Sequence, residues 1–265
     1  MADFVRTADA DGIRTITIDR PDVHNAFNEV VIAELTAAFN AAGSDDSVRV
    51  CVLASVGASF SAGADIIWMK RMIDYSREEN LADSRDMAGM LRAIRECERP
   101  VIARVHGACF GGGVGLVAAC DLAVAVEPAI FALTEVKLGI LPAVISPYVV
   151  ERIGAGHMRR FALTAERFGA AEAARIGLVS EAVADEAALD ERIAFFCKLL
   201  RGNGPEALAH CKRLLRDIQT ASDWDDVTTM TTERIAERRV SAEGQDGLKA
   251  FLEKRKPAWA AGAKA

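Results

Sequence analysis

The sequence predicts an α/β fold over its first two thirds and helices alone over its last third. Three nearly continuous apolar runs, residues 50–54, 101–103 and 122–126, are typical of strands covered on both faces of a sheet. Segments with a helical spacing of apolar residues lie between them. Strands that alternate with helices imply crossover connections, and therefore an α/β architecture. From about residue 186 onward we expect helices only.

The first elements can be placed from local patterns. Ile16 and Ile18 alternate with threonines, which predicts a half-buried strand near the start of the fold. A helix is expected after Asn25, because four apolar residues recur at helical spacing, and Gly43 is its expected C-terminal cap. The four residues are Val31, Ile32, Leu35 and Phe39.

The last third carries apolar stripes at helical spacing. One stripe lies within residues 189–200, a second helix opens at Pro205, and Ser222 with Asp225 is typical of a capping box that begins a third. Each stripe alone is explained by core packing, whereas together they can form an oligomer interface. We expect a subdomain boundary at 186–204 and no flexible linker there.

Composition and charge exclude several classes of protein. The 265 residues include 32 Lys+Arg and 38 Asp+Glu, a net charge of −6, and the pI near 5.4 disfavours nucleic-acid binding. The first residues lack the basic and apolar regions of a secretory signal, and the longest uncharged run, 105–120, is too short to span a bilayer. We therefore expect a cytoplasmic protein with no membrane partner.

The six cysteines form no CxxC pair, and a chain of 265 residues can hold a fold without disulfides. They are expected to be buried thiols, and no metal site is predicted.

Two glycine-containing loops follow buried strands directly, at residues 57–65 and 107–115. Gly111, Gly112 and Gly113 allow close backbone approach and leave free N–H groups at the start of an apolar helical run. Such a site favours developing negative charge. Neither loop has the GK[ST] ending or GxGxxG spacing of nucleotide-binding loops, nor the GxSxG of a nucleophile elbow. Tight packing of strand on helix is the alternative reason for the glycines.

The two loops, their spacing and the end of the chain together resemble the crotonase family, the enoyl-CoA hydratase/isomerase superfamily. The resemblance runs from about residue 11 to residue 260, and an ordered set of motifs over nearly the whole chain is a specific signal. The motifs are Asp19-Arg20-Pro21, Asn25-Ala26, SFSAGADI, HGACFGGGVGLVAACD, FALTEVKLGIL from Phe131 to Leu141, Gly177-Leu178-Val179 and Phe251-Leu252-Glu253-Lys254-Arg255.

The resemblance implies a crotonase-like spiral of ββα units over residues 1–190 and a C-terminal helical trimerisation region over 191–265. It implies a homotrimer or a dimer of trimers. The substrate would be an acyl-CoA thioester, with coenzyme A as part of the substrate and no other cofactor and no metal.

The family's chemistry passes through an enolate, whose oxygen is held by two backbone N–H groups. Carried onto this chain, these donors are Ala64 and Gly112. Glu135 matches one of the family's two catalytic glutamates, and its apolar neighbours predict a raised pKa suited to proton transfer. The other glutamate's position is Gly115, which is the main departure from the family pattern.

Gly115 leaves three explanations open. Residues 141–150, where many family members carry Gly-Gly-Thr, with residues 65–69 and 79–83, look most like hydratases of 3-methylglutaconyl-CoA or longer isoprenoid glutaconyl thioesters. We therefore expect hydration of a 2-enoyl-CoA, with a distal substrate carboxylate helping to position water. The alternatives are a Δ3-Δ2-enoyl-CoA isomerase that uses a single glutamate and a catalytically idle acyl-CoA-binding homologue.

Further residues are expected to contact the substrate. Asp65 is also an expected helix N-cap, Trp68 is equally explained as core, and the Ser146 hydroxyl can be satisfied locally. Phe251 and Lys254 would contact the coenzyme A of a neighbouring subunit, unless the lysine belongs to a solvated helix end. The full set is Ala62, Gly63, Asp65, Ile66, Trp68, Gly111, Gly115, Ser146, Tyr148, Phe251 and Lys254.

Overall fold

The computed structural model describes residues 4–260, which form two sheets built by one repeated unit. In each unit a first strand enters a six-stranded sheet, a short second strand enters a four-stranded sheet, and helical structure follows. The pairs β3 with β4, β5 with β6 and β7 with β8 repeat this step. The predicted spiral of ββα units is therefore confirmed.

The larger sheet has the spatial order β1 (Val5–Ala10), β2 (Ile13–Ile18), β3 (Val50–Ser55), β5 (Val101–Val105), β7 (Leu122–Val126) and β10 (Glu181–Val183). The smaller sheet has the order β4 (Ser59–Ser61), β6 (Ala108–Phe110), β8 (Ile130–Ala132) and β9 (Phe168–Gly169). Pairing is parallel from β2 through β10, and only β1 runs antiparallel to its neighbour in that sheet.

The apolar runs form the central strands, as their composition predicts. Every residue of β3 is buried, and Ile16 and Ile18 of β2 are completely buried. Strands covered on both faces lose the alternation of apolar and polar residues, because neither face meets water.

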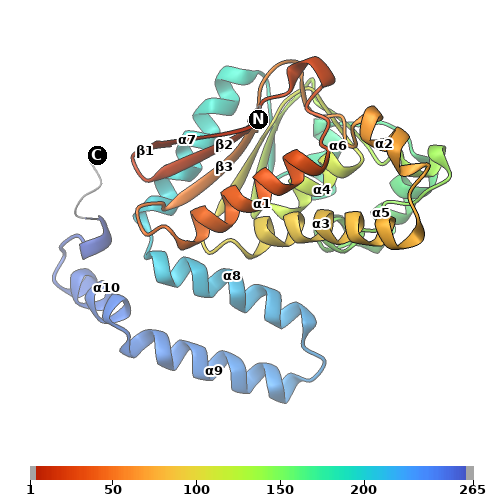
Figure 1. Cartoon of the computed structure of the whole chain (residues 1–265). Helices are drawn as coiled ribbons and strands as arrows, with labels where there is room; N and C mark the ends of the chain where they lie inside the picture. Colours follow the sequence, from red (N-terminus) through yellow and green to blue (C-terminus); the bar gives the residue numbers. More distant parts are fainter. Residues whose placement is uncertain (1–3, 261–265) are drawn as a thin grey trace.

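Helices cover both faces of the larger sheet (Figure 1). Figure 1 shows α1 and α7 on opposite faces, and α3 packs beside α1. The helices of this part of the chain are α1 (Glu29–Ser44), α2 (Ile66–Met72), α3 (Arg77–Glu96), α4 (Gly112–Ala119), α5 (Ser146–Thr164), α6 (Ala170–Arg175) and α7 (Glu186–Gly202), with 3-10 turns η1 (Pro21–Val23) and η2 (Glu135–Leu138).

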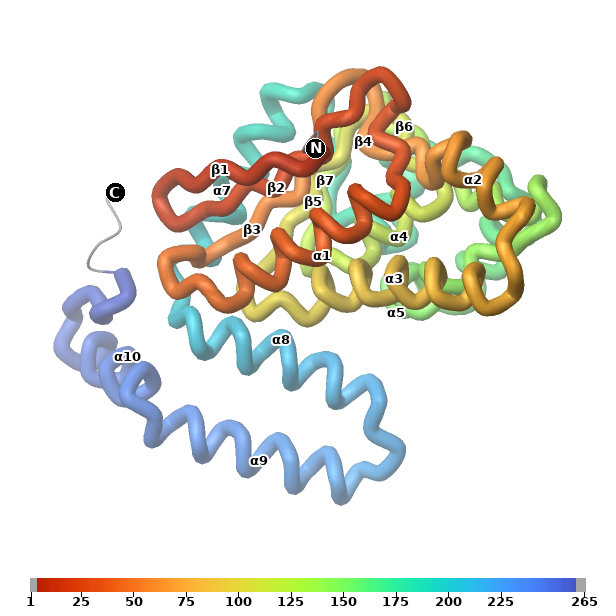
Figure 2. Tube along the Cα trace, in the orientation of Figure 1, coloured from red at the N-terminus to blue at the C-terminus, as the bar shows by residue number. Residues whose placement is uncertain are grey.

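The rest of the described chain is helical, as expected from residue 186 onward. It contains α8 (Pro205–Thr220), α9 (Trp224–Val240), α10 (Ala242–Leu252) and the 3-10 turn η3 (Ala258–Ala260). Figure 2 shows α8 and α9 running below the sheets as a hairpin. Several large apolar side chains lie exposed on these helices: Leu215, Ile218, Trp224, Ile235, Val240, Leu248, Phe251 and Leu252. Within residues 4–260, no helix combines the length and apolar character that crossing a membrane requires.

Three local expectations are corrected by the structure. The first helix ends at Ser44, and Gly43 instead lies close to the Cys97 sulfur and the Glu98 backbone. The cap of α9 is Asp223 rather than Ser222, because the Asp223 carboxylate accepts the Asp225 N–H. Five cysteines are buried and Cys211 is exposed. Residues 190 and 191, between which we expect the division into two regions, both lie in α7, which packs on β3, β5, β7 and β10, and the division stays a prediction.

Candidate active site

Three neighbouring parallel strands deliver the predicted catalytic groups to one edge of the sheet. The order β3, β5, β7 is contiguous, so the segments that follow these strands also lie side by side. They contain Ala64, Gly112 and Glu135, respectively. Residues that are far apart in sequence meet because ligand sites form beyond the carboxyl ends of parallel strands.

The first glycine loop turns sharply just before Ala64. Gly63 has φ +89°, a left-handed conformation that side chains disfavour. A Cβ atom placed on Gly63 would lie 2.9 Å from the Phe110 carbonyl oxygen and 3.6 Å from Gly112 N. The turn at residue 63 therefore needs a glycine, and it brings the two loops into direct contact.

The second loop opens helix α4. Gly111 is the N-cap with φ +51°, and Gly112 is the first helical residue. A Cβ on Gly112 would lie 2.2 Å from Phe27 Cζ, and a Cβ on Gly113 would lie 2.8 Å from the Ser61 carbonyl oxygen. The glycine run thus serves close packing, because a side chain on Gly112 or Gly113 would collide with its neighbours.

The N–H groups of Ala64 and Gly112 are available to a ligand. Across residues 4–260, neither is donated to a protein acceptor. The neighbouring N–H groups are used: Gly63 donates to Ser61 Oγ, Asp65 to Phe27 O, and Gly111 to Ala132 O. A pair of adjacent free donors, one at a helix N-terminus, suits an oxygen atom that becomes negatively charged.

Glu135 lies against the second loop. It is the first residue of η2, and a Cβ on Gly111 would be 3.1 Å from Glu135 Oε1. Its Oε2 is buried, with no hydrogen-bond partner among the residues that the structure describes. Burial raises the pKa of this carboxyl above its ordinary value, against the smaller effect of nearby backbone N–H groups. A carboxyl group with a raised pKa can both hold and release a proton near neutral pH.

Gly115 faces an apolar side chain. A Cβ on Gly115 would lie 2.3 Å from Ile145 Cγ2 and 2.8 Å from Ile145 Cβ. Ile145 is 1% exposed and precedes the first turn of α5. The space beside residue 115 is therefore filled by Ile145, so the departures at 115 and within 141–150 are in contact and form one structural change.

Asp65 caps α2 and pairs with Arg20. Its Oδ1 accepts the N–H groups of Ile67 and Trp68, and its Oδ2 accepts Arg20 Nη2 at 2.8 Å. Burial acts to raise the pKa of Asp65, but these hydrogen bonds outweigh it and hold the pKa below its ordinary value. The carboxylate thus caps α2, as expected, and both of its oxygens already accept hydrogen bonds from the scaffold.

Asn25 holds the first loop through its hydrogen bonds. It is completely buried with φ +53°, and its Nδ2 donates to the carbonyls of Val56 and Ser59. Its Oδ1 accepts the Arg20 N–H, and its own carbonyl accepts Ser61 Oγ. Each polar atom of this buried side chain is satisfied, as burial requires.

The other residues predicted to contact the substrate differ in how exposed they are and in whether their polar groups are already hydrogen-bonded. Trp68 is 2% exposed and donates from Nε1 to Asp83, so it belongs to the core, whereas Ile66 is 71% exposed. Ser146 Oγ donates to the Pro142 carbonyl at 2.6 Å, a local bond that satisfies the hydroxyl. Tyr148 is half-buried, and burial raises its pKa. Ala62 donates its N–H to the His24 carbonyl, which ties the loop to the preceding segment.

Phe251 and Lys254 lie far from the loops of their own chain. Figure 1 shows α10 and α2, which directly follows Ala64, at opposite ends of the molecule. Phe251 is 82% exposed, and Lys254 follows α10 with φ +53°. Within one chain, these residues therefore lie away from the two loops.

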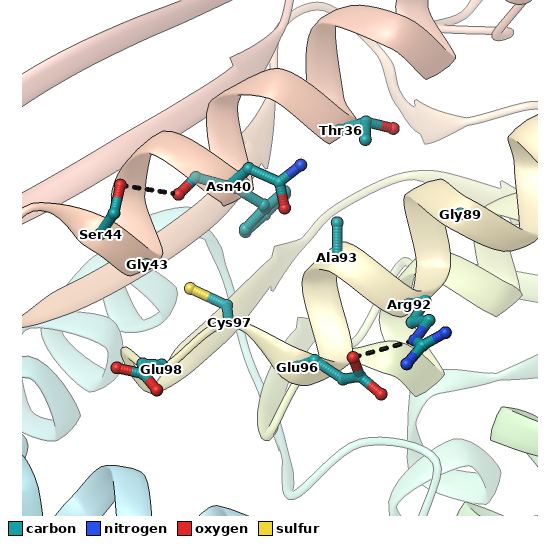
Figure 3. A pocket seen from close by; sticks show the side chains of 11 residues that line it. Thr36, Asn40, Gly43, Ser44, Gly89, Arg92, Ala93, Glu96, Cys97 and Glu98 are labelled. Carbon is teal, nitrogen blue, oxygen red and sulfur yellow. Dashed lines mark hydrogen bonds and ion pairs between the residues drawn. The ribbon is translucent and has the colours of Figure 1, made fainter.

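A separate cavity of about 500 Å³ lies between α1 and α3 (Figure 3). Its walls include Asn40, Ala93 and Cys97, and Arg92 and Glu96 form an ion pair at its rim. It contains none of the predicted site residues. Over the described part of the chain, no cluster of His, Cys, Asp and Glu side chains suits a metal ion.

Two residues of the site were not predicted from the sequence. Phe27 contacts both loops, and Ile145 fills the space beside Gly115. Phe27 follows Asn25-Ala26 directly, but an apolar residue before a helix carries no signal of which glycine it touches. Ile145 lies in the segment that departs from the family pattern, and its contact with Gly115 appears only in three dimensions.

Known proteins resemble this chain along its whole length. The profile of the enoyl-CoA hydratase/isomerase family matches residues 8–262. The 2,3-dehydroadipyl-CoA hydratase of Escherichia coli is 30% identical, over 91% of this chain and 92% of that protein. The peroxisomal Delta(3,5)-Delta(2,4)-dienoyl-CoA isomerase of Arabidopsis thaliana is 29% identical, over 92% and 91%. An enoyl-CoA hydratase structure from Shewanella pealeana superposes with a TM-score of 0.94 at 39% identity, covering 97% of this chain and 96% of that one. With its two free loop N–H groups and a buried glutamate beside them, the chain belongs to the enoyl-CoA hydratase/isomerase family of enzymes.

Proposed function

We propose that this enzyme adds water to a 2-enoyl-CoA thioester. One observation carries the proposal: Glu135 Oε1 lies against Gly111, directly beside the free Gly112 N–H, while its Oε2 is buried without a partner. A thioester oxygen bound between Ala64 and Gly112 would bring its α-carbon to the side of the second loop on which this carboxyl group lies. The arrangement joins an acid–base group to an anion-stabilising pair, as enolate chemistry requires.

The reaction follows from these groups. Water attacks the β-carbon, and the electron pair of the double bond moves onto the thioester oxygen, which the Ala64 and Gly112 N–H groups stabilise. Protonated Glu135 gives its proton to the α-carbon, and the proton released by the water restores the acid. One such hydrogen-bond donor contributes about 3 kcal/mol of transition-state stabilisation in other enzymes. Burial raises the pKa of Glu135, which favours the protonated form that this step uses.

The proposed substrate carries a second carboxylate at the far end of its acyl group, as 3-methylglutaconyl-CoA does. Gly115 and Ile145 supply no group that could hold the attacking water, so the substrate's own carboxylate would help to position it. The name of the Escherichia coli relative denotes a thioester of a dicarboxylic acid, which supports this class. Unimpaired turnover of the corresponding amide, which lacks the negative charge, would contradict this part of the proposal.

Isomerisation of a 3-enoyl-CoA to a 2-enoyl-CoA is the second candidate. The contact between Gly115 and Ile145 favours it, because one carboxyl group is sufficient to remove a proton from the α-carbon and return it to the γ-carbon. The Arabidopsis relative is named a dienoyl-CoA isomerase, so isomerases occur among similar chains.

We further propose that the active enzyme is a trimer or a dimer of trimers in the cytoplasm. The exposed apolar residues of α8, α9 and α10 would pack against neighbouring subunits, and Phe251 and Lys254 would meet the coenzyme A of a neighbour. A monomer at micromolar concentration in analytical ultracentrifugation would contradict this assembly.

The test is mass spectrometry of 2-enoyl-, 3-enoyl- and 3-methylglutaconyl-CoA after incubation with the wild type and Glu135→Gln. Gain of one water by 3-methylglutaconyl-CoA, lost in the variant, is the expected result. Unchanged mass with a shifted double bond would establish the isomerase. Thioester binding with no turnover of any substrate would make the protein an idle binder and overturn the proposal.

A further inference from the structure

We propose that Phe27 is a positioning residue that fixes the spacing between the two N–H groups that bind the thioester oxygen. This inference rests on the proposed enolate chemistry. Phe27 is 1% exposed and lies between the two glycine loops, touching one with its backbone and the other with its ring.

The backbone of Phe27 holds the first loop on both sides of Ala64. Phe27 N donates to the Gly63 carbonyl at 2.8 Å, and the Phe27 carbonyl accepts the Asp65 N–H at 3.0 Å. Phe27 and Ala64 pair as an isolated parallel bridge. These hydrogen bonds engage Gly63 and Asp65, the two neighbours of Ala64. The Phe27 backbone therefore sets the direction in which the free Ala64 N–H points.

The ring of Phe27 supports the second loop at the residue that carries the other donor. A Cβ atom on Gly112 would lie 2.2 Å from Cζ and 3.1 Å from Cε1 of this ring, whereas the only other atom that close is Cε of Met87. The ring edge therefore packs directly on the Gly112 backbone. A rigid aromatic ring cannot yield as a flexible methionine end can.

Phe27 thus contacts the backbone at both N–H donors. Its two backbone hydrogen bonds set the position of Ala64, and its ring sets how closely Gly112 can approach. Misplacement of about 1 Å at a catalytic group can cost about a hundredfold in rate. A shorter side chain at position 27 would let the second loop relax toward the first without touching the substrate.

The test measures enolate stabilisation directly. Acetoacetyl-CoA ionises to an enolate with a near-ultraviolet absorption band, and its pH titration on the protein reports how well the two N–H groups hold the oxygen. Phe27→Leu, which lacks the Cε and Cζ atoms, should bind about tenfold less enolate at a given pH and lower kcat about tenfold, with KM and butyryl-CoA affinity within twofold of wild type. Phe27→Met, whose chain reaches as far as the ring edge but is flexible, should recover only part of the enolate signal.

Phe39→Leu is the matched control, because Phe39 is equally buried but lies on the wall of the cavity between α1 and α3. Phe39→Leu should lower the free energy of unfolding about as much as Phe27→Leu does, and it should leave the enolate titration unchanged. If Phe27→Leu titrates like Phe39→Leu, the positioning role is wrong. If the wild type itself forms no enolate band, the proposed function fails instead, so the two failures can be told apart.

A double-mutant cycle tests the contact itself. Gly112→Ala should nearly abolish enolate binding in the wild type, because its Cβ collides with Phe27 Cζ. In the Phe27→Leu background the collision with Cζ is removed and the nearest remaining neighbour is the flexible end of Met87 at 3.1 Å, so the effect of the same substitution should be at least tenfold smaller. Equal effects of Gly112→Ala in both backgrounds would show that the ring does not set the position of Gly112.

Discussion

The two glycine loops perform the same task, but different forces hold them. The first loop is held by polar groups: the Asn25 side chain, Ser61 Oγ, and the Asp65 carboxylate with Arg20. The second loop is held by close packing, since Phe27, Ser61 and Ile145 occupy the space beside its glycines. The comparison teaches that the first loop should be sensitive to loss of hydrogen bonds and charge, in addition to added volume at Gly63, whereas the second should be sensitive chiefly to added volume.

The largest expected effect is that of added volume in the second loop. Gly112→Ala forces a methyl group to within 2.2 Å of Phe27 Cζ, so kcat should fall by about two orders of magnitude. The overpacking should also lower the free energy of unfolding by about 1–3 kcal/mol. Steady-state kinetics and urea denaturation measure both effects.

Gly89→Ala is the matched control for that substitution. Gly89 lies within helix α3, and a Cβ there would have no neighbour within 4 Å. Alanine should stabilise the protein by about 0.5–1 kcal/mol and leave kcat unchanged. If Gly112→Ala behaved like Gly89→Ala, packing would not be what holds the second loop.

In the first loop, loss of hydrogen bonds should have the next largest effect. Asn25→Ala removes two donors to the Val56 and Ser59 carbonyls and one acceptor of the Arg20 N–H, all at a buried site. Buried groups left without partners should lower the free energy of unfolding by about 3 kcal/mol. Urea denaturation compares the stability of Asn25→Ala with that of Asn40→Ala, a control at an exposed position on α1. Equal stability of the two variants would mean that the polar network does not hold the loop.

Much of this arrangement could be predicted from the sequence, because it depends on local patterns. The apolar runs around Val50, Ile102 and Val124 predict the central strands, and the family motifs place Ala64, Gly112 and Glu135 on the segments that follow. The spiral order is confirmed by the pairing of β3, β5 and β7.

What holds the loops could not be predicted, because it depends on contacts between distant residues. The pairing of Arg20 with Asp65 spans 45 positions, and the contact between Gly115 and Ile145 joins α4 to the start of α5. Local patterns also gave small errors. Gly43 is typical of a helix cap, but it lies within α1, where this helix closely approaches the Cys97 backbone. The assembly and the roles of Phe251 and Lys254 stay predictions.

Loss of the Asp65 charge in the first loop should lower stability less than loss of the Asn25 side-chain amide does. Asp65→Asn can still cap α2, but it removes the ion pair with Arg20, so it should cost about 2 kcal/mol at neutral pH. The pKa of Asp65 is lowered in the folded state, so its contribution is present above the unfolded value of 3.8 and is lost as pH falls through the folded value. Urea denaturation from pH 7 down to pH 3 should show the wild-type advantage over Asp65→Asn shrinking. A constant difference would show that the pair contributes no pH-dependent stability.

The smallest expected effect on stability has the opposite sign and comes from the Glu135 carboxyl group, which lies against the second loop. Burial raises the pKa of Glu135, so ionisation weakens the folded state, and stability falls as pH rises from the unfolded value of 4.5 through the folded value. Glu135→Gln cannot ionise and should therefore be more stable than the wild type at pH 7, but not at pH 4. Thermal denaturation at the two pH values checks this. A variant that is less stable than the wild type at pH 7 would show that the ionised carboxylate has a partner.

The central claim is that Glu135 moves a proton at the carbon next to a thioester held by the two loops. Deuterium incorporation tests it most directly: 3-hydroxyacyl- and 3-enoyl-CoA thioesters are incubated with the enzyme in D2O, and mass spectrometry and NMR locate the label. We predict one deuterium at the α-carbon with the wild type, and incorporation at least a hundredfold slower with Glu135→Gln while thioester affinity is retained. Equal rates of incorporation with the two proteins would contradict the account.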